Sequence, residues 1–565
     1  QLKPFEATLR RHAHVPTMNV SLMHSLSPNT LWDIRIGHFA YSQENDPSSG
    51  NFTTPNRFDE TTSVSSGAPQ EIGSLRLVRT TGKATLTHYQ RGFLRANHEW
   101  KFGTQFEKGD HRETQIIPTG TRFVDRKGQP FRTVSRSPSV NGGQFVTAAL
   151  FATDTMTIGE RLTVNAGVRF DHSRAIVQDI PAIDVEGRET GGIVPGLGTM
   201  YTWNSLSPRL GVTFRLTGDG RTLLRSSYGR FHQGVLTGEI SPIHPGITPT
   251  TTMQFDPETG GYTRLVSVVD PKINVLVDPY TRSPLTDEYS IGVDRELTRY
   301  LAVSAAYVYK SGRDYIGWTD VGGQYREETR TMPDGRVVPV HVLTNFTSDR
   351  RFMVTNPDGY SMKYNGLVVA VEKRSSNGWQ LFGSYTFSRV EGLQASNGLS
   401  IASASGGQSS TIAGNVIYGR DPNDLTNARG RLPNDRPHMF KAMGSFEVPH
   451  TGLTIAGNMQ YFTGKPWAAT AQVDLPQGTQ RIFLEPRGSR RVASQALLDL
   501  RVSRTVLSGG WGSVELLVDV LNTLNSTAEE SLATDNLYAP NFGQPTVFTD
   551  PRRAMIGVRL ILGAE

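Results

Sequence analysis

The chain contains no cysteine among its 565 residues, and this absence removes several classes of protein at once. It rules out a disulfide scaffold, a thiol nucleophile and a cysteine-ligated metal site within this sequence. The sequence also lacks any uninterrupted run of about 18 apolar residues, which a membrane-spanning helix would need. A helical membrane protein is therefore excluded, whereas a membrane β-barrel is not.

Charge is sparse and nearly balanced. Charged residues make up 19% of the chain, and 58 Lys and Arg against 52 Asp and Glu leave a net charge of +6. Because this excess is only about one charge per hundred residues, with no dense basic block, a nucleic-acid partner is not expected. The apolar share with glycine included is that of an ordinary folded protein, which argues against disorder.

The beginning of the sequence lacks a leader. Residue Gln1 is not an initiator, and no charged, apolar, small-residue signal follows it. We therefore expect that processing or truncation removed the start of the chain.

The dominant feature that is present is a strict alternation of apolar and polar residues, which is the period of a β-strand. Leu162, Val164, Ala166, Val168 and Phe170 alternate with Thr163, Asn165, Gly167 and Arg169. The same pattern recurs to the last segment, where Ile556, Val558, Leu560 and Leu562 take the apolar positions. It predicts about seventeen strands, most of them about ten to fourteen residues long.

The connections between these strands alternate between short and long. The short ones are tight turns of the hairpin type, at residues 28–29, 158–160, 218–220, 377–378, 449–452 and 508–510. The long ones are polar and cover roughly residues 43–82, 111–143, 174–203, 234–284, 312–360, 391–435, 465–493 and 526–550. This alternation is typical of an outer-membrane barrel with tight periplasmic turns and long extracellular loops.

The two faces of the predicted strands have different chemistry. The apolar face carries almost no Lys or Arg at mid-strand, as expected for a wall against lipid. The other face carries Arg35, Lys101, Glu107, Arg169, Asp294, Asp499, Arg501, Glu515, Asp519 and Arg559, which a wet lumen would solvate. Aromatic residues near strand ends suit interfacial girdles, namely Trp32, Tyr41, Tyr228, Tyr309, Phe387, Tyr461 and Trp511. The fold predicted is all-β, a transmembrane antiparallel β-barrel in the bacterial outer membrane.

Several local strings resemble the barrel of TonB-dependent outer-membrane receptors, in particular their Oar-like subgroup. The strings are residues 206–212 (LSPRLGV), 224–231 (LRSSYGRF), 377–379 (NGW) with 385–388 (YTFS), 435–440 (DRPHMF), 460–466 (QYFTGKP), 498–503 (LDLRVS), 518–525 (VDVLNTLN), 541–544 (NFGQ) and 550–553 (DPRR). Each string is short, but their order and spacing extend over almost the whole chain.

The resemblance implies a barrel of 22 strands around a plug, and general barrel geometry also places plugged transporters at that size. About seventeen strands are visible, so we expect that residues 1–16 are the remnant of an upstream strand or loop. Residues 17–565 are then a partial receptor barrel, with the other strands, the plug and the segment that contacts TonB upstream. The sequence departs from the family at its end, where residues 560–565 (LILGAE) replace the usual terminal aromatic.

Catalytic and metal sites find little support in the sequence. His12 and His14 form a pair without a third ligand nearby, and residues 421–427 hold oxygen ligands without the glycine turn and closing Glu of a calcium loop. No nucleophile elbow or other catalytic motif is present. We expect no enzyme activity, no metal and no cofactor.

Aromatic residues in the long connections are the candidate ligand contacts, because exposed rings can stack on sugars or planar chelates. They are Tyr201 with Trp203, Tyr315 with Trp318, and Trp467. Roles in a girdle or in loop packing are the alternative for each of them.

The function expected from the resemblance is TonB-dependent uptake of a scarce nutrient, such as a ferric chelate or an oligosaccharide, by a monomeric barrel. Its partners would be the lipid bilayer and lipopolysaccharide, the TonB complex through the plug region, the small-molecule ligand and the outer-membrane assembly machinery. A passive porin-like channel or a surface adhesion barrel is the first alternative. A soluble all-β carbohydrate-active protein is the second.

Overall fold

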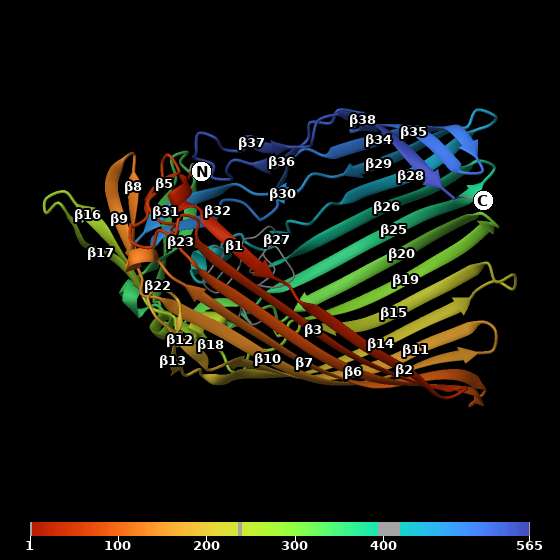
Figure 1. Cartoon of the computed structure of the whole chain (residues 1–565), viewed down its shortest axis with the longest axis horizontal. Helices are drawn as coiled ribbons and strands as arrows, with labels where there is room; N and C mark the ends of the chain where they lie inside the picture. The colour runs from red at the N-terminus through yellow and green to blue at the C-terminus, as the bar shows by residue number, and fades with distance from the viewer. Residues whose placement is uncertain (1–2, 236–239, 394–418, 564–565) are drawn as a thin grey trace.

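A computed structural model describes residues 3–235, 240–393 and 419–563, and most of them belong to one antiparallel β-wall (Figure 1). Its strands in spatial order are β1 (Leu9–His14) with β2 (Thr17–Ser27), β3 (Thr30–Pro47), β6 (Gly73–Phe93), β7 (Ala96–Gln115), β10 (Ser139–Ile158), β11 (Leu162–Val177), β14 (Gly198–Arg215), β15 (Thr222–His232), β19 (Leu285–Thr298), β20 (Leu301–Arg313), β25 (Ser361–Ser376), β26 (Trp379–Leu393), β28 (His438–Val448), β29 (Leu453–Phe462), β34 (Gln495–Gly509), β35 (Gly512–Leu521) and β38 (Arg553–Leu562).

Strands β1 and β2 pair end to end with the single strand β3, and the short β27 (Gly430–Arg431) pairs with the end of β26. The nineteen strands of the sheet therefore make a wall seventeen strands wide, in agreement with the sequence. Each neighbour in the wall is also the next wall strand along the chain, which is the up-and-down order of a barrel. Within the described residues, the outer edges of β38 and of β1 with β2 have no strand partner.

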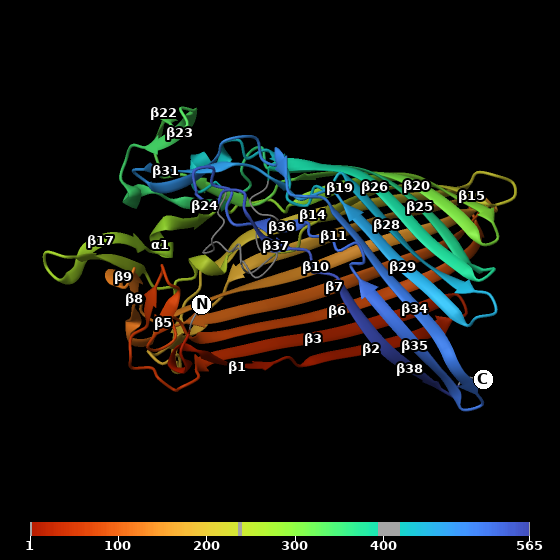
Figure 2. The same ribbon diagram turned by 90° about the horizontal axis from the view of Figure 1, so that it is seen from above.

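Every short turn predicted from the sequence joins two neighbouring strands at one end of the wall. The turn at Asn377 and Gly378 is representative, since both residues have positive φ angles, 53° and 75°, as a type I′ hairpin requires. The eight long connections lie at the other end (Figures 1 and 2). The predicted division into a turn end and a loop end is confirmed.

The alternating residues point to the two sides of the wall as the sequence predicts, with the apolar rows on the outer surface and the polar positions toward the interior. Trp32, Leu86, Phe102, Ala152, Val168 and Pro208 form one continuous cross-strand row over six strands. Buried residues on the opposite face of β11, β14, β25 and β26 meet in one hydrophobic cluster. Strands on different sides of the wall can share a cluster only across its interior, so the Trp32 row lies on the outer surface. Val168 in that row is 44% exposed.

The prediction that Tyr41 belongs to the aromatic girdle is wrong, because its side chain lies on the inner face of the wall. Tyr41 lies six residues after Arg35 on the same strand and therefore on the same inner face, and its hydroxyl donates to Gln43 on that face. Tyr228, Tyr289 and Tyr309 instead form the outer aromatic row, with ring centroids 4.8 and 6.2 Å apart.

Six strands in the first half of the wall are longer than expected, from 16 residues in β11 to 21 in β6. A barrel strand needs only about 9–11 residues to cross the bilayer. The pairing of β6, β7, β10 and β11 continues past the apolar rows, where charged side chains replace apolar ones on the outer face. Alternation of hydrophobicity ends there, so the apolar–polar pattern does not predict these extensions.

The long connections fold into a cap at the loop end (Figure 2). A six-stranded sheet joins three connections in the order β17 (Gly261–Val269), β16 (Thr250–Asp256), β9 (Gln129–Ser135), β8 (Thr121–Arg126), β4 (Arg57–Asp59) and β5 (Val64–Ser66). A three-stranded sheet contains β18 (Val275–Val277), β24 (Phe352–Thr355) and β21 (Gly317–Asp320).

Hairpins complete the cap. They are β12 (Ile180–Ile183) with β13 (Glu189–Val194), β22 (Tyr325–Thr331) with β23 (Val337–Leu343), β31 (Thr470–Leu475) with β32 (Gly478–Phe483), β30 (Pro466–Trp467) with β33 (Arg490–Arg491), and β36 (Glu529–Leu532) with β37 (Pro545–Phe548). The β22–β23 and β31–β32 hairpins bury a shared core that includes Val340 and Ile482.

Helical structure in the described ranges is confined to short turns. The α-helix α1 spans Pro271–Asn274, and 3₁₀ turns lie at Phe5–Ala7, Pro118–Gly120, Ser241–Ile243, Thr347–Asp349 and Pro422–Leu425. None of the helices in the described part of the chain has the length and hydropathy to cross a membrane.

Candidate functional site

The inner face of the wall is lined by charged residues that pair with one another. Arg79 lies 2.7 Å from Glu107, Arg169 lies 2.7 Å from Asp171, and Lys310 lies 2.8 Å from Glu288. Further pairs along the same face are Arg35 with Asp33, Arg225 with Asp294, Arg501 with Asp519 and Arg559 with Glu515. Partly exposed pairs contribute only about 0–1 kcal/mol each, so they make the interior hydrophilic more than they stabilise it.

One recess on this inner face combines an exposed aromatic ring with charge. It has a volume of about 370 Å³ and lies over β10, β11, β14, β15 and β19. The Arg209 guanidinium lies 4.9 Å from the centroid of Phe231, a ring that is 44% exposed. Glu288 and Asn165 are among its other polar lining residues. These groups can stack on an apolar ligand face and hydrogen-bond its edges.

A second recess, of about 720 Å³, lies over β2, β3 and β6. Arg35, Arg79 and Lys83 line it together with Phe39, which is 38% exposed. Its three cations have partners in Asp33, Glu107 and the Phe151 ring, respectively. The recess therefore offers donors to an anionic ligand from side chains that the wall already holds in place.

Glycine shapes the first recess. The position that a Cβ of Gly229 would occupy lies 3.0 Å from the Phe231 ring, so a side chain there would push against the ring. Gly211 has only ordinary contacts, with Asn165 at 3.7 Å. Of these two glycines, Gly229 thus has a defined role in leaving space for an aromatic side chain.

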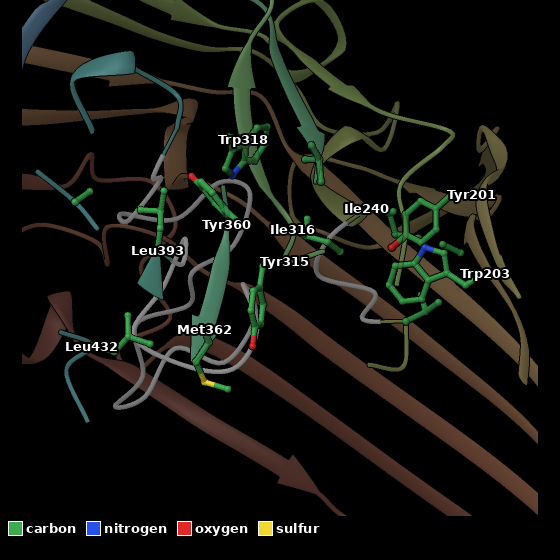
Figure 3. Packing of buried hydrophobic residues seen from close by; sticks show 14 of the residues in the cluster. Tyr201, Trp203, Ile240, Tyr315, Ile316, Trp318, Tyr360, Met362, Leu393 and Leu432 are labelled. Atoms are coloured by element: carbon green, nitrogen blue, oxygen red, sulfur yellow. The ribbon is translucent and has the colours of Figure 1, made fainter. Parts of the chain in front are cut away.

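Four of the five aromatic candidates lie inside the cap and not at its surface (Figure 3). Tyr201 and Trp203 project from the inner face of β14, stack with centroids 5.0 Å apart, and are each 3% exposed. The Trp203 indole donates a 2.7 Å hydrogen bond to the Thr281 carbonyl. Through this hydrogen bond, the connection between β15 and β19 contacts strand β14 of the wall.

Tyr315 and Trp318 belong to the same buried cluster and lie near its middle in Figure 3, away from the Tyr201–Trp203 pair. They are 6% and 2% exposed. Tyr360 lies close to both residues, and the Arg420 guanidinium lies 4.1 Å from the centroid of Trp318. The cluster brings these four candidates into one layer between wall and cap.

Trp467 stands apart from that cluster and is half-buried. Its ring packs on Phe542 at 5.6 Å and receives the Arg490 guanidinium at 5.3 Å. The expectation that the candidates are exposed is therefore wrong for Tyr201, Trp203, Tyr315 and Trp318, because the connections fold back and bury them. Ligand binding by any of the five stays a prediction.

A buried ion cluster holds the cap together near this layer. The Arg350 guanidinium lies 2.8 Å from Asp320 and 3.4 Å from Asp421, and all three side chains are at most 11% exposed. Burial alone would raise the pKa of Asp320, but hydrogen bonds from Tyr325 and Arg350 outweigh it and hold the pKa below its usual value. Burial, reinforced by the Asp320 carboxylate, raises the pKa of Tyr325. Asp320 is thus ionised at neutral pH.

The stretch considered for a loop cation has another role. Asp421 accepts from the Asn423 amide at 3.0 Å, and Asp424 accepts from the amides of Gly419 and Asp421, forming a capping box on the 3₁₀ turn. Burial raises the pKa of Asp424 to about 7. The described residues contain no cluster of three or more acidic or histidine side chains that could hold a metal, and His12 and His14 lie exposed on β1.

The residues that the sequence reading overlooked are those of the lumen recesses, above all Arg209, Phe231, Lys83 and Arg79. For Arg209 and Phe231 a signal was available, since both take polar-face positions next to or within strands that the alternation predicts. Arg79 fell within the predicted connection 43–82 and carried no such signal. An aromatic ring on the polar face, as at Phe231, is the exception that marks the recess. The selection of loop aromatics missed it because it assumed that long connections leave their rings exposed.

Comparison with known proteins agrees with this geometry. Residues 4–480 match the model of the family described as outer membrane beta barrel domain. The TonB-dependent transporter Oar of Myxococcus xanthus is 22% identical over 350 residues, which are 56% of this chain and 29% of the relative.

Solved structures share the fold at low identity. The outer membrane transporter YddB from Escherichia coli superposes with a TM-score of 0.58 and 14% identity, covering 97% of this chain and 63% of that one. The siderophore receptor PiuA from Acinetobacter baumannii gives a TM-score of 0.53 and 12% identity, with coverage of 97% of this chain and 64% of that one. The chain therefore spans less than two thirds of both structures and less than a third of the curated relative.

Proposed function

The chain belongs to the outer membrane beta barrel domain family, and from this premise we propose that it is the barrel wall of a TonB-dependent receptor that imports a scarce nutrient. The family places the wall in the bacterial outer membrane, with an antiparallel barrel fold. The proteins that it matches are described as transporters and a receptor, and we expect no enzyme activity from this chain.

The observation that carries this proposal is the wide charged lumen with two recesses beneath a folded cap. A wall of seventeen strands already has the width of a large porin, and plugged transporters have about 22 strands. The edges of β38 and of β1 with β2 would leave backbone groups unpaired in lipid, at a cost of several kcal/mol for each group. Upstream strands and a plug, with residues 17–565 as part of the barrel, would satisfy these edges and fill the lumen.

The ligand would meet the inner face before the plug. The Arg209–Phe231 recess and the Arg35–Arg79–Lys83 recess suit a compact ligand with anionic or hydroxyl edges and one apolar face, such as a ferric chelate or an oligosaccharide. Energised release would come from the TonB complex acting on the plug region. Insertion by the outer-membrane assembly machinery and a monomeric state complete the proposal.

Two measurements on the full-length protein test it. In planar bilayers a plugged receptor shows no steady conductance, whereas a passive porin-like channel shows stepwise ohmic conductance. The purified C-terminal domain of TonB from the same organism is expected to bind the full-length receptor, and an adhesion barrel would not bind it. Steady conductance or absent TonB binding would overturn the proposal.

A further inference from the structure

Three arginines share one face of the six-stranded sheet in the cap, where strands β8, β9 and β16 are consecutive (Figure 1). Arg122 on β8 is the cross-strand partner of Val134 on β9. Arg132 and Arg136 lie two residues to either side of Val134, and the Arg136 amide continues the pairing with a 2.9 Å hydrogen bond to the Gly120 carbonyl. Because residues two apart on a strand point to the same face, the three guanidinium groups are neighbours around Val134.

The same face carries two uncharged polar side chains from β16. Thr252 is the partner of Val134, and Gln254 is the partner of Arg132. Both residues are half-buried, and neither forms a side-chain hydrogen bond with another residue of the described ranges. A hydroxyl and an amide therefore lie next to the arginines and can donate hydrogen bonds to a common acceptor.

Two of the arginines already have acidic partners. Arg132 lies 3.5 Å from Glu60, a carboxylate that also pairs with Arg126 two strand positions beyond Val124. Arg136 lies 3.1 Å from Glu71. Each carboxylate is thus already engaged by at least one guanidinium group.

Arg122 has no such partner. In the part of the chain that the structure describes, its side chain forms no hydrogen bond and no ion pair within 4 Å, and its Nε atom is buried without a partner. Its Nη atoms are not buried in this way, so they are the donors that reach solvent. Burial lowers the pKa of Arg122, and the charges of Arg136 and Arg132 add to this effect against the opposing effect of Glu71.

The four arginines of the β8–β9 hairpin therefore share two carboxylates, which leaves an excess of two positive charges. We propose that this face of the cap sheet binds a phosphate dianion, either as the free ion or as the monoester group of a larger molecule. A phosphate monoester carries a charge of about −1.5 to −2 at neutral pH, which balances that excess. Its oxygens would accept charge-assisted hydrogen bonds from Arg122 and Arg132 and neutral ones from Gln254 and Thr252.

A phosphate at this position would join two connections that are far apart in the sequence. Strands β8 and β9 belong to the connection between β7 and β10, whereas β16 belongs to the connection between β15 and β19. Binding should therefore stabilise the cap sheet. The site is separate from the two lumen recesses and rests on the cap sheet alone, so it stands or fails independently of the proposed transport.

Equilibrium dialysis of the full-length protein in detergent tests this inference, with radiolabelled inorganic phosphate as the probe. We expect saturable binding, and Arg122→Gln should weaken it at least about tenfold because a charge-assisted hydrogen bond is lost. Arg326→Gln removes an exposed arginine from the β22–β23 hairpin of the cap, and Lys83→Gln removes a cation from a lumen recess. Both controls should stay within about twofold of the unmodified protein, and absent saturable binding or an equal loss in either control would overturn the proposal.

Hydrogen exchange of residues 121–135 separates phosphate binding from a merely structural role of Arg122. Phosphate is expected to increase protection in the unmodified protein and not in Arg122→Gln. Without phosphate, the variant should be protected at least as well as the unmodified protein, because the substitution removes repulsion from Arg132 and Arg136. Lower protection of the variant in both conditions would contradict the proposal.

Competing anions identify the source of the phosphate group. Tighter binding of glycerol phosphate than of inorganic phosphate would assign the site to the monoester of a larger molecule, and equal or weaker binding would assign it to the free ion. Acetate at equal ionic strength carries one charge and should not displace the probe. Displacement by acetate at the same concentrations as phosphate would overturn the assignment of a dianion site.

Discussion

At the residue scale, whether a side chain faces lipid or the lumen decides which substitutions the wall accepts at that position. Val168 lies on the outer surface in the row with Phe102 and Pro208, whereas Thr163 occupies the inner face of the same strand. Arg at the bilayer midplane costs about 2–4 kcal/mol on the lipid face. We expect Val168→Arg to reduce the folded fraction in an outer-membrane assembly assay, with Thr163→Arg much milder. Equal tolerance of the two variants would refute the facing assignment.

A glycine on the inner face gives a second prediction at this scale. The Cβ position of Gly103 lies 2.3 Å from the Phe151 ring and 2.8 Å from the Ala84 carbonyl oxygen, which is backbone. Gly103→Val should therefore displace Phe151 and cost about 1–3 kcal/mol. The matched control is Gly82→Val, because a Cβ at Gly82 meets nothing within 4 Å.

The readout for these two variants is the temperature at which the folded band is lost on a semi-native gel. A lower transition temperature for Gly103→Val, with Gly82→Val close to the unmodified protein, is expected. The reverse order would mean that the packing of Phe151 over β7 is not as described.

At the element scale, buried charge fixes the connection between β20 and β25 to the cap. Asp320→Asn would leave Arg350 buried with Asp421, 3.4 Å away, as its one carboxylate partner among the described residues. Removing one partner of a buried ion pair costs about 3–5 kcal/mol. We expect limited proteolysis within residues 314–360 to accelerate by at least about tenfold. Glu186→Gln, which breaks an exposed pair with Arg188, should leave the cleavage rate unchanged.

The contribution of the capping carboxyl Asp424 to stability depends on pH with the opposite sign to that of Asp320. Since burial raises its pKa from 3.8 to about 7, its stabilising contribution is present below pH 3.8 and is lost as pH rises to about 7. Asp320, with a lowered pKa, loses its stabilising contribution only as pH falls below the ordinary value of 3.8, so that contribution does not vary between pH 5 and 8.

Hydrogen exchange of residues 419–432, corrected for intrinsic rates, tests this account. Protection should fall between pH 5 and 7 and then level off, and Asp424→Asn should remove that slope. A slope that survives the substitution would assign the pH dependence to another group.

Strands and cap differed in how well the sequence predicted them. Segments such as residues 162–170 alternate between apolar and polar residues because one face meets lipid and the other water. This pattern is local in the sequence and could therefore be predicted from it. Backbone pairing extends β6, β7 and β10 beyond the point where the apolar–polar alternation ends. Charged residues such as Lys108 and Arg112 lie on the outer face of these extensions. The burial of Tyr201 and Trp318 depends on contacts among connections far apart in sequence, which no local pattern encodes.

At the scale of the whole molecule, the account requires a closed, detergent-dependent barrel. Because a closed hydrogen-bonded wall stays compact in SDS until boiled, the full-length protein should migrate faster before heating than after it. A soluble all-β protein would instead remain monodisperse in plain buffer and migrate identically in both lanes.

The most direct test of the central claim is a nitroxide scan of residues 162–170 in the full-length protein in bilayers. The 565 residues contain no cysteine, so each introduced cysteine is the sole thiol in this region. We predict that collision with oxygen, which concentrates in lipid, peaks at residues 164, 166, 168 and 170, and that collision with a water-soluble nickel chelate peaks at 163, 165, 167 and 169. If the collision rates with oxygen and with the chelate peaked at the same residues, or if the chelate reached every position equally, the claim that one face of the wall meets lipid and the other water would be contradicted.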